Sequence, residues 1–326
     1  MIEVHNLTKV YGQHVAVDHV SFTIDSGKIY GFLGPNGAGK STTMNIITGC
    51  LAATEGTVLV DGHDIFEEPI LAKKCIGYLP EVPPLYLDMT VTDYLRFVAE
   101  AKGVPGKQMA AEVARVMEKT GVTDMRLRLI KHLSKGYRQR VGLAQAILGD
   151  PKVIILDEPT VGLDPQQLIE IRELIRELGR ERTVMLSSHI MQEISAVCDT
   201  LIIIANGRLV AEDTPDNLAR MAEHTQTLRL SVRAEAERAR EVIAHAGDGL
   251  EVLSHRTVGE GETELEIRVP SQEDVRERLF YAFADAKCAI LSMAREQQSL
   301  EDVFLTLTAG TAAAEPAAQQ EGGDGQ

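Results

Sequence analysis

The 326-residue sequence lacks any long hydrophobic run. Its longest candidates, at 153–156 and 201–205, have only the length of strands, whereas a membrane helix needs roughly 18–20 apolar residues. The N-terminus also lacks a basic segment followed by an apolar stretch, which is the pattern of a secretory signal. We therefore expect a chain that stays in the cytosol.

Cysteine and positive charge are scarce. The four cysteines, at positions 50, 75, 198 and 288, have none of the spacings of a metal site or a disulfide framework. We expect four reduced, buried thiols. Lys and Arg number 33 against 48 Asp and Glu, which gives a formal net charge of −15. Such a chain does not attract a phosphate backbone, so nucleic acid is not an expected partner, although a local basic patch would remain compatible with one.

The sequence does contain a regular alternation of strands and helices. Paired strands are expected at 2–7 and 15–24, and a third, at 28–34, leads into a glycine-rich turn and a helix. Residues 91–149 predict several helices, and residues 153–205 alternate buried strands with amphipathic helices. This order favours an α/β fold with a mainly parallel sheet covered by helices.

The pattern restarts after about residue 220. The predicted order β-α-β-β-α-β within 221–308 suggests a small α+β, ferredoxin-like domain that closes with a helix at 299–308. Residues 309–326 have no apolar periodicity and predict a disordered tail. We therefore expect a domain at 1–220, a second at 221–308 and a tail.

A glycine-rich loop, GPNGAGKST at 34–42, fits G-x-x-x-x-G-K-[ST] between a strand and a helix. Its glycines let successive N–H groups point at phosphate oxygens, and the helix N-terminus adds its dipole. Lys40 would charge-pair with the terminal phosphates, and the Ser41 hydroxyl would bind Mg²⁺. A coincidental glycine turn rarely has this context, so we predict a phosphate site. The residues expected to form it are Gly34, Asn36, Gly37, Gly39, Lys40, Ser41 and Thr42.

Two acidic residues follow the apolar strand at 153–156. Asp157 stands at its carboxyl end, where ligands bind in open α/β sheets, and would hold Mg²⁺ directly or through water. Glu158 is the natural general base for an attacking water. Taken alone, a strand that ends in acidic turn residues would explain the pair equally well, but the phosphate loop upstream favours the functional interpretation. Together the motifs indicate a P-loop NTPase, a class that includes kinases, helicases and motor ATPases.

The stretch LSKGYRQRVGLAQAILGDPKVIILDEPTVGLD at 133–164 resembles the ABC (ATP-binding cassette) ATPases, whose signature LSGGQ opens a helix before the second motif. The resemblance extends over residues 1 to about 220. It implies a RecA-like core, an antiparallel β subdomain, a helical subdomain and the hydrolysis of ATP with Mg²⁺. Ser134 is a natural helix cap, and N–H groups around Gly136 can bind an anion. In the family that anion is the γ-phosphate held by the other subunit, which implies a head-to-tail homodimer or a pair with a related cassette.

Other positions match the family in the expected order. Tyr11 stands where the family has an aromatic residue stacked on adenine, although a half-buried strand tyrosine would also explain it. Asp164 matches the D-loop. His189, after an apolar strand, matches the switch histidine that contacts the γ-phosphate, whereas a lone histidine is often only a satisfied turn residue. The implied catalytic residues are Lys40, Glu158 and His189.

Two departures from the family pattern are informative. Glu81 stands where many members have a glutamine that senses Mg²⁺ and contacts the membrane subunit; a glutamate keeps an oxygen ligand but adds a charge. Lys135 and Tyr137 replace the usual Gly and Gln of the signature. Together with the ending SLEDVFLTLT, these features resemble the ABC-2 exporter branch, and within it the ATPases of gliding motility and of nitrous oxide reductase maturation.

The resemblance implies a subunit on the cytoplasmic face of the membrane that drives an ABC-2 type integral membrane permease in the direction of export, as ATP closes a dimer and hydrolysis reopens it. A helix of the permease would enter a groove within 81–130, and the exposed candidates are Val82, Pro83, Pro84, Leu85 and Tyr86. The alternative is a soluble ABC ATPase that acts in translation, on DNA or in force transmission. The single cassette and the acidic balance disfavour it.

Overall fold

The computed structural model describes residues 1–223, 226–247, 249–259, 261–269, 274–296, 301, 303–305 and 308. The chain divides into a first unit, chiefly Met1–Thr214, and a second unit, Pro215–Thr306. The expected tail at 309–326 lies outside the described residues, as does much of the closing helix expected at 299–308.

A six-stranded sheet in the order β10-β9-β3-β8-β7-β6 forms the core of the first unit. The five strands from β9 to β6 pair in parallel, whereas β10 pairs antiparallel with β9. The strands are β3 (Ile29–Leu33), β6 (Ile76–Leu79), β7 (Val153–Leu156), β8 (Thr183–Ser188), β9 (Thr200–Ala205) and β10 (Arg208–Asp213). Every residue of β3, β7 and β8 is buried, as expected of a sheet covered on both faces. The prediction of a mainly parallel sheet is confirmed.

A second, antiparallel sheet has the order β2-β1-β4-β5. Its strands are β1 (Ile2–Tyr11), β2 (His14–Ile24), β4 (Glu55–Val60) and β5 (His63–Asp64). The β1–β2 hairpin runs four residues beyond the expected strand end, because Gly12, with φ of 61°, makes a tight turn that pairs Tyr11 with His14. One buried cluster, which includes Phe22, Phe32 and Met44, joins this sheet to α1 (Lys40–Ile47) and the parallel strands.

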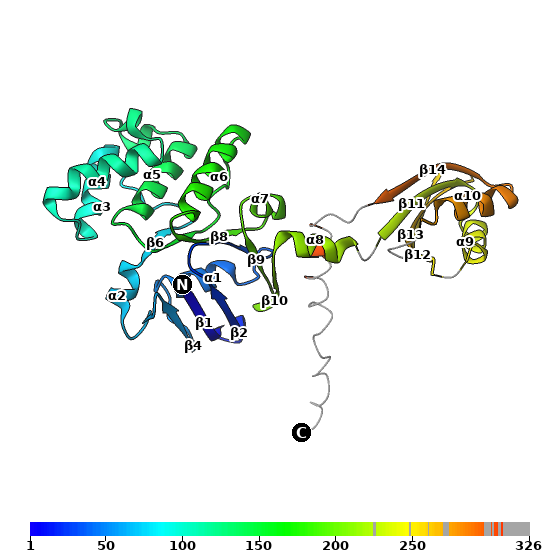
Figure 1. Cartoon of the computed structure of the whole chain (residues 1–326), viewed down its shortest axis with the longest axis horizontal. Helices are drawn as coiled ribbons and strands as arrows, with labels where there is room; N and C mark the ends of the chain where they lie inside the picture. The colour runs from blue at the N-terminus through cyan, green and yellow to red at the C-terminus, as the bar shows by residue number, and fades with distance from the viewer. Residues whose placement is uncertain are drawn as a thin grey trace, which may run out of the picture. The chain divides into compact units, whose positions relative to one another are not determined.

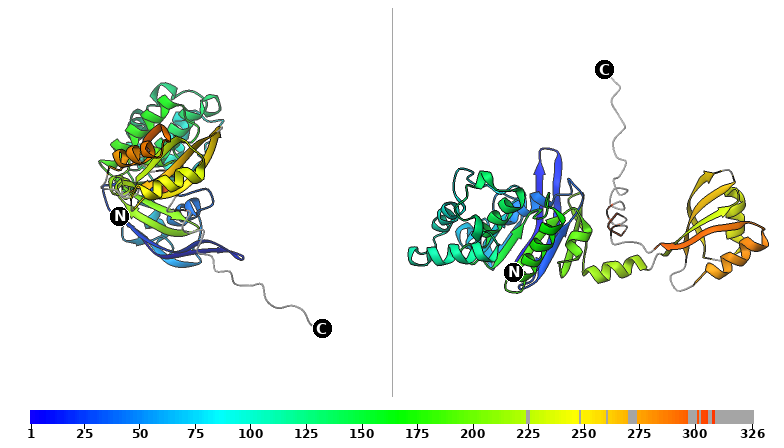
Figure 2. Two further views of the ribbon diagram at one scale, coloured as in Figure 1. Left: turned by 90° about the vertical axis from the view of Figure 1, so that its right-hand side faces the viewer. Right: turned by 90° about the horizontal axis from the view of Figure 1, so that it is seen from above.

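Three helices form the helical part of the first unit: α3 (Val91–Ala101), α4 (Gly106–Lys119) and α5 (Lys135–Ile147). Figures 1 and 2 show them as one group, apart from the blue antiparallel strands. Thr90 caps α3, because its Oγ1 accepts a hydrogen bond of 3.2 Å from Asp93 N. The other helical segments are α2 (Pro69–Lys74), 3₁₀ turns at Thr123–Met125 and Ile130–His132, α6 (Pro165–Gly179) and α7 (Met191–Ser195). The P-loop cassette fold with its antiparallel and helical subdomains is thus confirmed.

The second unit has a sheet in the order β12-β13-β11-β14, with every pair antiparallel. Its elements are α8 (Pro215–Glu223), β11 (Gln226–Arg233), α9 (Ala236–His245), β12 (Glu251–Gly259), β13 (Glu262–Val269), α10 (Arg276–Asp285) and β14 (Ala289–Glu296). The order from β11 to β14 is β-α-β-β-α-β. A separate core, with Leu230, Ile243, Ile267 and Phe283 at its centre, joins the sheet to α9 and α10.

All four cysteines are free thiols. Cys198 is buried, Cys75 and Cys288 are half-buried, and Cys50 is exposed in the loop after α1, so the prediction that all four are buried holds at Cys198 and was wrong at the other three. In the part of the chain that the structure describes, no helix is both long enough and apolar enough to cross a membrane.

Candidate active site

The glycine-rich loop connects β3 to α1, and its glycines are required for packing as well as for backbone freedom. A Cβ on Gly34 would lie 2.4 Å from the carbonyl oxygen of Ile204. A Cβ on Gly39, where φ is 100°, would lie 2.5 Å from the carbonyl oxygen of Ala16. The loop therefore lies directly against β9 and β2 on one side, whereas Asn36, Gly37 and the start of α1 line a cavity on the other.

Lys40, the first residue of α1, is only 7% exposed. Its Nζ donates hydrogen bonds to the carbonyl oxygens of Gly34, at 2.8 Å, and Pro35, at 3.2 Å. Burial lowers the pKa of its ammonium below the ordinary value. The negative charges of three carboxylates oppose this shift: Glu158, Asp157 and Glu81. The loop cation thus lies within electrostatic reach of all three predicted acidic residues.

The two acidic residues after β7 are held differently. Asp157 is 4% exposed, and its backbone N donates to the carbonyl oxygen of Leu79 at 2.8 Å. Glu158 has a left-handed backbone, with φ of 48°. Nδ1 of His189 lies 3.1 Å from Oε1 and 3.0 Å from Oε2 of the Glu158 carboxylate. The predicted base and the predicted switch histidine are therefore in direct contact.

A cavity of about 420 Å³ opens in front of these groups. Its walls come from the β1–β2 hairpin, the phosphate loop and the segments that follow β6, β7 and β8. The lining residues are Tyr11, His14, Ala16, Asn36, Gly37, Gly39, Lys40, Ser41, Thr42, Glu81, Glu158, Val161 and His189. Most of the site residues expected from the sequence therefore meet at one cavity, with Tyr11 at the hairpin and Glu158 beside His189.

Five predicted residues do not line this cavity. Gly34 and Asp157 are held beside the cavity by hydrogen bonds: the Gly34 carbonyl oxygen accepts from Lys40 Nζ, and Asp157 N donates to the carbonyl oxygen of Leu79. Asp164 caps α6 by accepting from Gln167 N at 2.9 Å. Ser134 caps α5 by accepting from Tyr137 N at 3.3 Å. Gly136 follows in the first turn of α5, where the side chain of Gln167 covers it so closely that a Cβ would lie 2.3 Å from Oε1.

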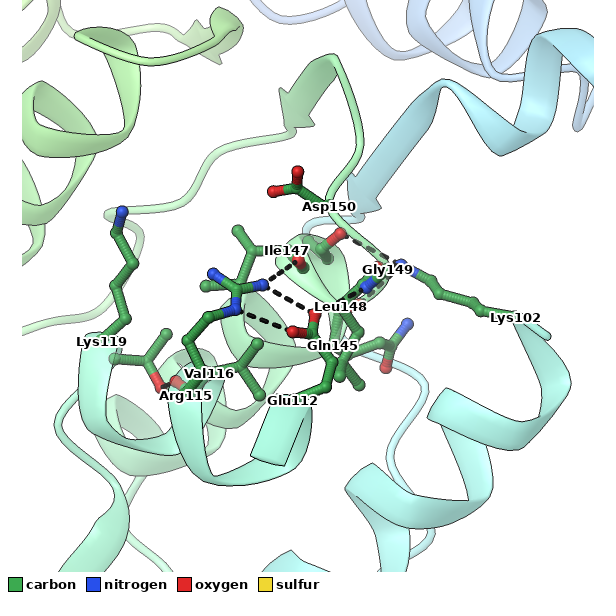
Figure 3. A network of polar contacts seen from close by, with 12 residues as sticks. Lys102, Glu112, Arg115, Val116, Lys119, Gln145, Ile147, Leu148, Gly149 and Asp150 are labelled. Carbon is green, nitrogen blue, oxygen red and sulfur yellow. Dashed lines mark hydrogen bonds and ion pairs between the residues drawn. The ribbon is translucent and has the colours of Figure 1, made fainter. Parts of the chain in front are cut away.

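The α5 helix that begins at Ser134 is held at its other end by a polar network (Figure 3). Lys102 Nζ donates to the carbonyl oxygens of Gln145, Ala146 and Leu148 at 2.8, 3.1 and 3.0 Å. Arg115 binds the Glu112 carboxylate through two nitrogens and donates to the carbonyl oxygen of Ile147 at 3.4 Å. Cations are favourable at a helix C-terminus, so α3 and α4 brace α5 here.

The donor set suits Mg²⁺ when a phosphate group contributes further oxygens. Ser41 offers a hydroxyl on the cavity wall, and Asp157 and Glu81 offer hard carboxylate oxygens near the same lysine. In the described residues no three His, Cys, Asp or Glu side chains form a ready-made metal site. Mg²⁺ commonly binds through one or two carboxylates together with substrate phosphates, so the residues fit this ion.

Some functional positions were missed by sequence reasoning. His14 and Ala16 line the cavity although no motif contains them, and Val161 lines it although it was not singled out within 133–164. His14 stands just before the expected second strand. The glycine turn at position 12, which pairs His14 with Tyr11, could have indicated that His14 lies beside the predicted adenine site. Ser187, in LSSH, contacts both acidic residues, and nothing in its sequence position indicates this role.

Comparison with known proteins also identifies ATP-binding proteins of ABC transporters as relatives of this chain. The family model described as "ABC transporter" matches residues 17–161. The chain is 32% identical over 315 residues to the linearmycin resistance ATP-binding protein LnrL of Bacillus subtilis, covering 95% of this chain and 99% of the relative. It is 33% identical over 312 residues to the bacitracin transport ATP-binding protein BcrA of Bacillus licheniformis, covering 95% and 98%.

Among solved structures, the dimeric bacterial ABC transporter cassette MJ0796 superposes with a TM-score of 0.61 at 25% identity, covering 66% of this chain and 99% of that one. The chain therefore belongs to the ABC transporter family, as an ATP-binding subunit that hydrolyses ATP. Relatives named for ABC transporters or for bacitracin transport favour the transport interpretation over a soluble ATPase acting on translation or DNA.

Proposed function

We propose that this chain drives an ABC-2 type exporter from the cytoplasmic face of the membrane. The observation that carries the proposal is the convergence of the phosphate loop with the Glu158–His189 pair on one cavity. The relatives named for linearmycin resistance and bacitracin transport support an antibiotic-like cargo moved outward. The likeness to the gliding-motility and nitrous-oxide-reductase-maturation ATPases remains a further expectation, as does a ferredoxin-like assignment for the second unit.

Within the cavity we assign a binding role to each group of side chains. Lys40, Asn36 and the N–H groups of the loop bind the phosphates, and Thr42 and Ser41 continue that wall into α1. Tyr11 is 48% exposed and presents its ring for stacking on adenine. Lys9 Nζ lies 5.2 Å from the centre of that ring, which orients it through a cation–π contact. Mg²⁺, when bound by Ser41, Asp157 and Glu81, supplies positive charge for the phosphates.

Hydrolysis follows from the contact between Glu158 and His189. The Glu158 carboxylate accepts a proton from the attacking water at one of its oxygens. When both ring nitrogens carry a proton, His189 Nδ1–H donates to the same carboxylate and holds the base in place, and Nε2–H is left to donate to the γ-phosphate. Lys40 stabilises charge on the transferred phosphoryl group. These roles define the proposed catalytic set.

The three predicted ligands that lie off the cavity support a two-chain site. Ser134 and Gly136 stand at the N-terminus of α5, and Asp164 stands at the start of α6, and none of the three lines the cavity of its own chain. We infer that they complete the site of a second copy, or of a related cassette, in a head-to-tail dimer. The cassette MJ0796 is described as dimeric, which supports a pairing of two cassettes.

An exposed apolar surface supports a membrane partner. Val82, Tyr86 and Phe97 are each at least 44% exposed, and the rings of Tyr86 and Phe97 lie 5.3 Å apart. Of the residues expected to form the groove, Val82, Pro84 and Tyr86 are exposed, whereas Pro83 and Leu85 are half-buried. An apolar patch of this kind suits a short helix of an integral membrane permease.

Partner capture tests the proposal. Tagged Glu158→Gln protein is expressed in the native host, membranes are extracted in detergent with ATP and Mg²⁺, and co-purifying proteins are identified by mass spectrometry. A stoichiometric polytopic membrane protein is expected, and its loss in a Val82→Asp/Tyr86→Asp double variant would locate the contact. Reproducible recovery of only soluble proteins or ribosomes would overturn the transport assignment.

A further inference from the structure

Ser187 joins the two acidic residues of the site from a neighbouring strand. It is the last residue but one of β8 and is fully buried. Its Oγ accepts a hydrogen bond of 2.9 Å from Glu158 N and donates one of 2.6 Å to Asp157 Oδ1. A hydroxyl has one proton to donate and lone pairs to accept with, so this single group serves both acidic residues at once.

The first hydrogen bond explains how Glu158 keeps an unusual backbone. Its φ of 48° lies in the left-handed region, which residues other than glycine rarely adopt. Glu158 is only 8% exposed, so its N–H needs a partner within the protein. Ser187 Oγ is that partner. In this backbone conformation the Glu158 side chain reaches His189, with both carboxylate oxygens within 3.1 Å of Nδ1.

The second hydrogen bond orients Asp157. Ser187 engages Oδ1, and Asp157 is 4% exposed, so its carboxylate has little freedom to rotate. Within the described residues, no hydrogen bond reaches Oδ2. That oxygen therefore remains available for Mg²⁺ or its bound water, which is the role proposed for Asp157.

We propose that Ser187 is a positioning residue for ATP hydrolysis, which sets the backbone of Glu158 and the carboxylate of Asp157 together. The proposal rests on the roles proposed above for those two residues. It requires a hydroxyl at position 187, because an apolar side chain would leave a buried N–H and a buried carboxylate oxygen unpartnered at the same time. The two hydrogen bonds of Ser187 go to the acidic pair and not to the phosphate loop, so it should affect turnover more than nucleotide affinity.

The test compares Ser187→Ala with Thr183→Val in the full-length chain. Thr183 lies in the same strand, is 2% exposed, and its Oγ1 accepts from Gly27 N at 3.2 Å, far from the acidic pair. Both variants lose one buried hydroxyl. We expect Ser187→Ala to lower kcat roughly 10- to 100-fold, as for loss of a hydrogen bond to a charged group. Its KM for ATP should change by less than about threefold, whereas Thr183→Val should keep kcat within about twofold.

Two further variants keep the test decisive if Ser187→Ala does not fold. Ser187→Thr retains the hydroxyl and should restore most of the turnover, whereas Ser187→Cys offers a weaker donor and should fall between Thr and Ala. Wild-type kcat in Ser187→Ala or Ser187→Cys, or equal losses in Ser187→Ala and Thr183→Val, would overturn the proposal. Glu158→Gln distinguishes failure of the base assignment from failure of the Ser187 proposal. If Glu158→Gln hydrolyses ATP at the wild-type rate, the base assignment fails. If it is inactive while Ser187→Ala hydrolyses ATP at the wild-type rate, only the Ser187 proposal fails.

Discussion

Nδ1 of His189 lies 3.0 Å from Oε2 of Glu158 and 3.1 Å from Oε1, so it is within hydrogen-bond distance of both oxygens of the carboxylate. The Glu158 side chain is almost buried, whereas the His189 side chain is 41% exposed on the cavity side. The pair therefore presents a fixed carboxylate and an accessible ring to whatever occupies the cavity. In the proposed mechanism that arrangement determines where the attacking water loses its proton.

Removal of the imidazole should separate catalysis from binding. We expect His189→Ala to lower kcat roughly 100-fold with little change in KM, because the base loses the group that holds it. His14→Ala is the matched control, since His14 lines the same cavity without a contact to Glu158. Steady-state phosphate release measures both variants. Equal losses of kcat in the two would contradict the distinct role of His189.

The close packing of the phosphate loop predicts a difference between two of its glycines. Gly34→Ala places a Cβ 2.4 Å from the Ile204 carbonyl oxygen and should cost about 2 kcal/mol or more of unfolding free energy. Gly37→Ala meets no atom within 4 Å and should cost only about 1 kcal/mol, because of its φ of 82°. Urea denaturation of both variants checks this order. A smaller loss for Gly34→Ala would show that the loop does not lie against β9.

The brace on α5 predicts a pH effect. Burial lowers the pKa of the Lys102 ammonium to about 8, whereas in the unfolded chain a lysine titrates near 10.4. Between these two pH values the unfolded chain binds more protons than the folded one, so this group makes stability rise with pH. We expect the melting temperature of wild type minus that of Lys102→Met to increase from pH 7.5 to pH 9.5.

The control for this effect is Lys152→Met. The Lys152 ammonium is exposed and pairs with Asp61, which raises its pKa instead of lowering it. The melting temperature of wild type minus that of Lys152→Met should therefore not rise from pH 7.5 to pH 9.5. At pH 7.5, Lys102→Met should itself lose about 1–2 kcal/mol, because the last carbonyls of α5 lose their cation. If the melting-temperature difference for Lys102→Met stayed constant or fell over this pH range, the lowered pKa of Lys102 would be contradicted.

The two-chain site predicts complementation. Ser134→Asp keeps a good helix cap but adds a negative charge where the partner's γ-phosphate would bind, and Lys40→Ala disables the loop of its own chain. Each variant alone should be inactive. In an equal mixture, half of the dimers contain both chains and one site in two is intact, so up to about a quarter of wild-type activity should return.

Thr90→Asp controls for the new carboxylate. Thr90 caps α3 as Ser134 caps α5, by accepting from the backbone N three residues on, but its hydroxyl also donates to Asp93 Oδ2, so the new carboxylate is introduced together with Asp93→Asn. This variant should retain wild-type activity without any partner. If the mixture of Ser134→Asp and Lys40→Ala recovered nothing although the chains exchanged, each chain would have to complete its own site.

Residues close together in the sequence made the chemistry predictable. The phosphate loop and the Asp157–Glu158 pair were identified because each is a short segment at the end of a buried strand. Ser187 was missed because it meets Glu158 across 29 positions of sequence, and only the pairing of β7 with β8 brings them together. His14 was missed because the hairpin turns later than its apolar pattern indicates.

The same distinction applies to the fold. Long apolar strands and capped helices such as α3 were predicted, since their signals are periodic and local. The edge strand β10 and the short helix α2 were not, because half-exposed segments of six residues carry little periodicity. Their places depend on neighbours that the sequence does not identify, such as β9 for β10.

Glu158→Gln tests the central claim most directly, with ATP turnover and oligomeric state measured on the same sample. The amide cannot accept the proton from water, but it leaves the phosphate loop intact. We predict that the variant binds ATP, forms a dimer in ATP and Mg²⁺ by light scattering, and hydrolyses roughly 100- to 10,000-fold more slowly than wild type. Hydrolysis at the wild-type rate, or a monomer at saturating ATP, would contradict the account.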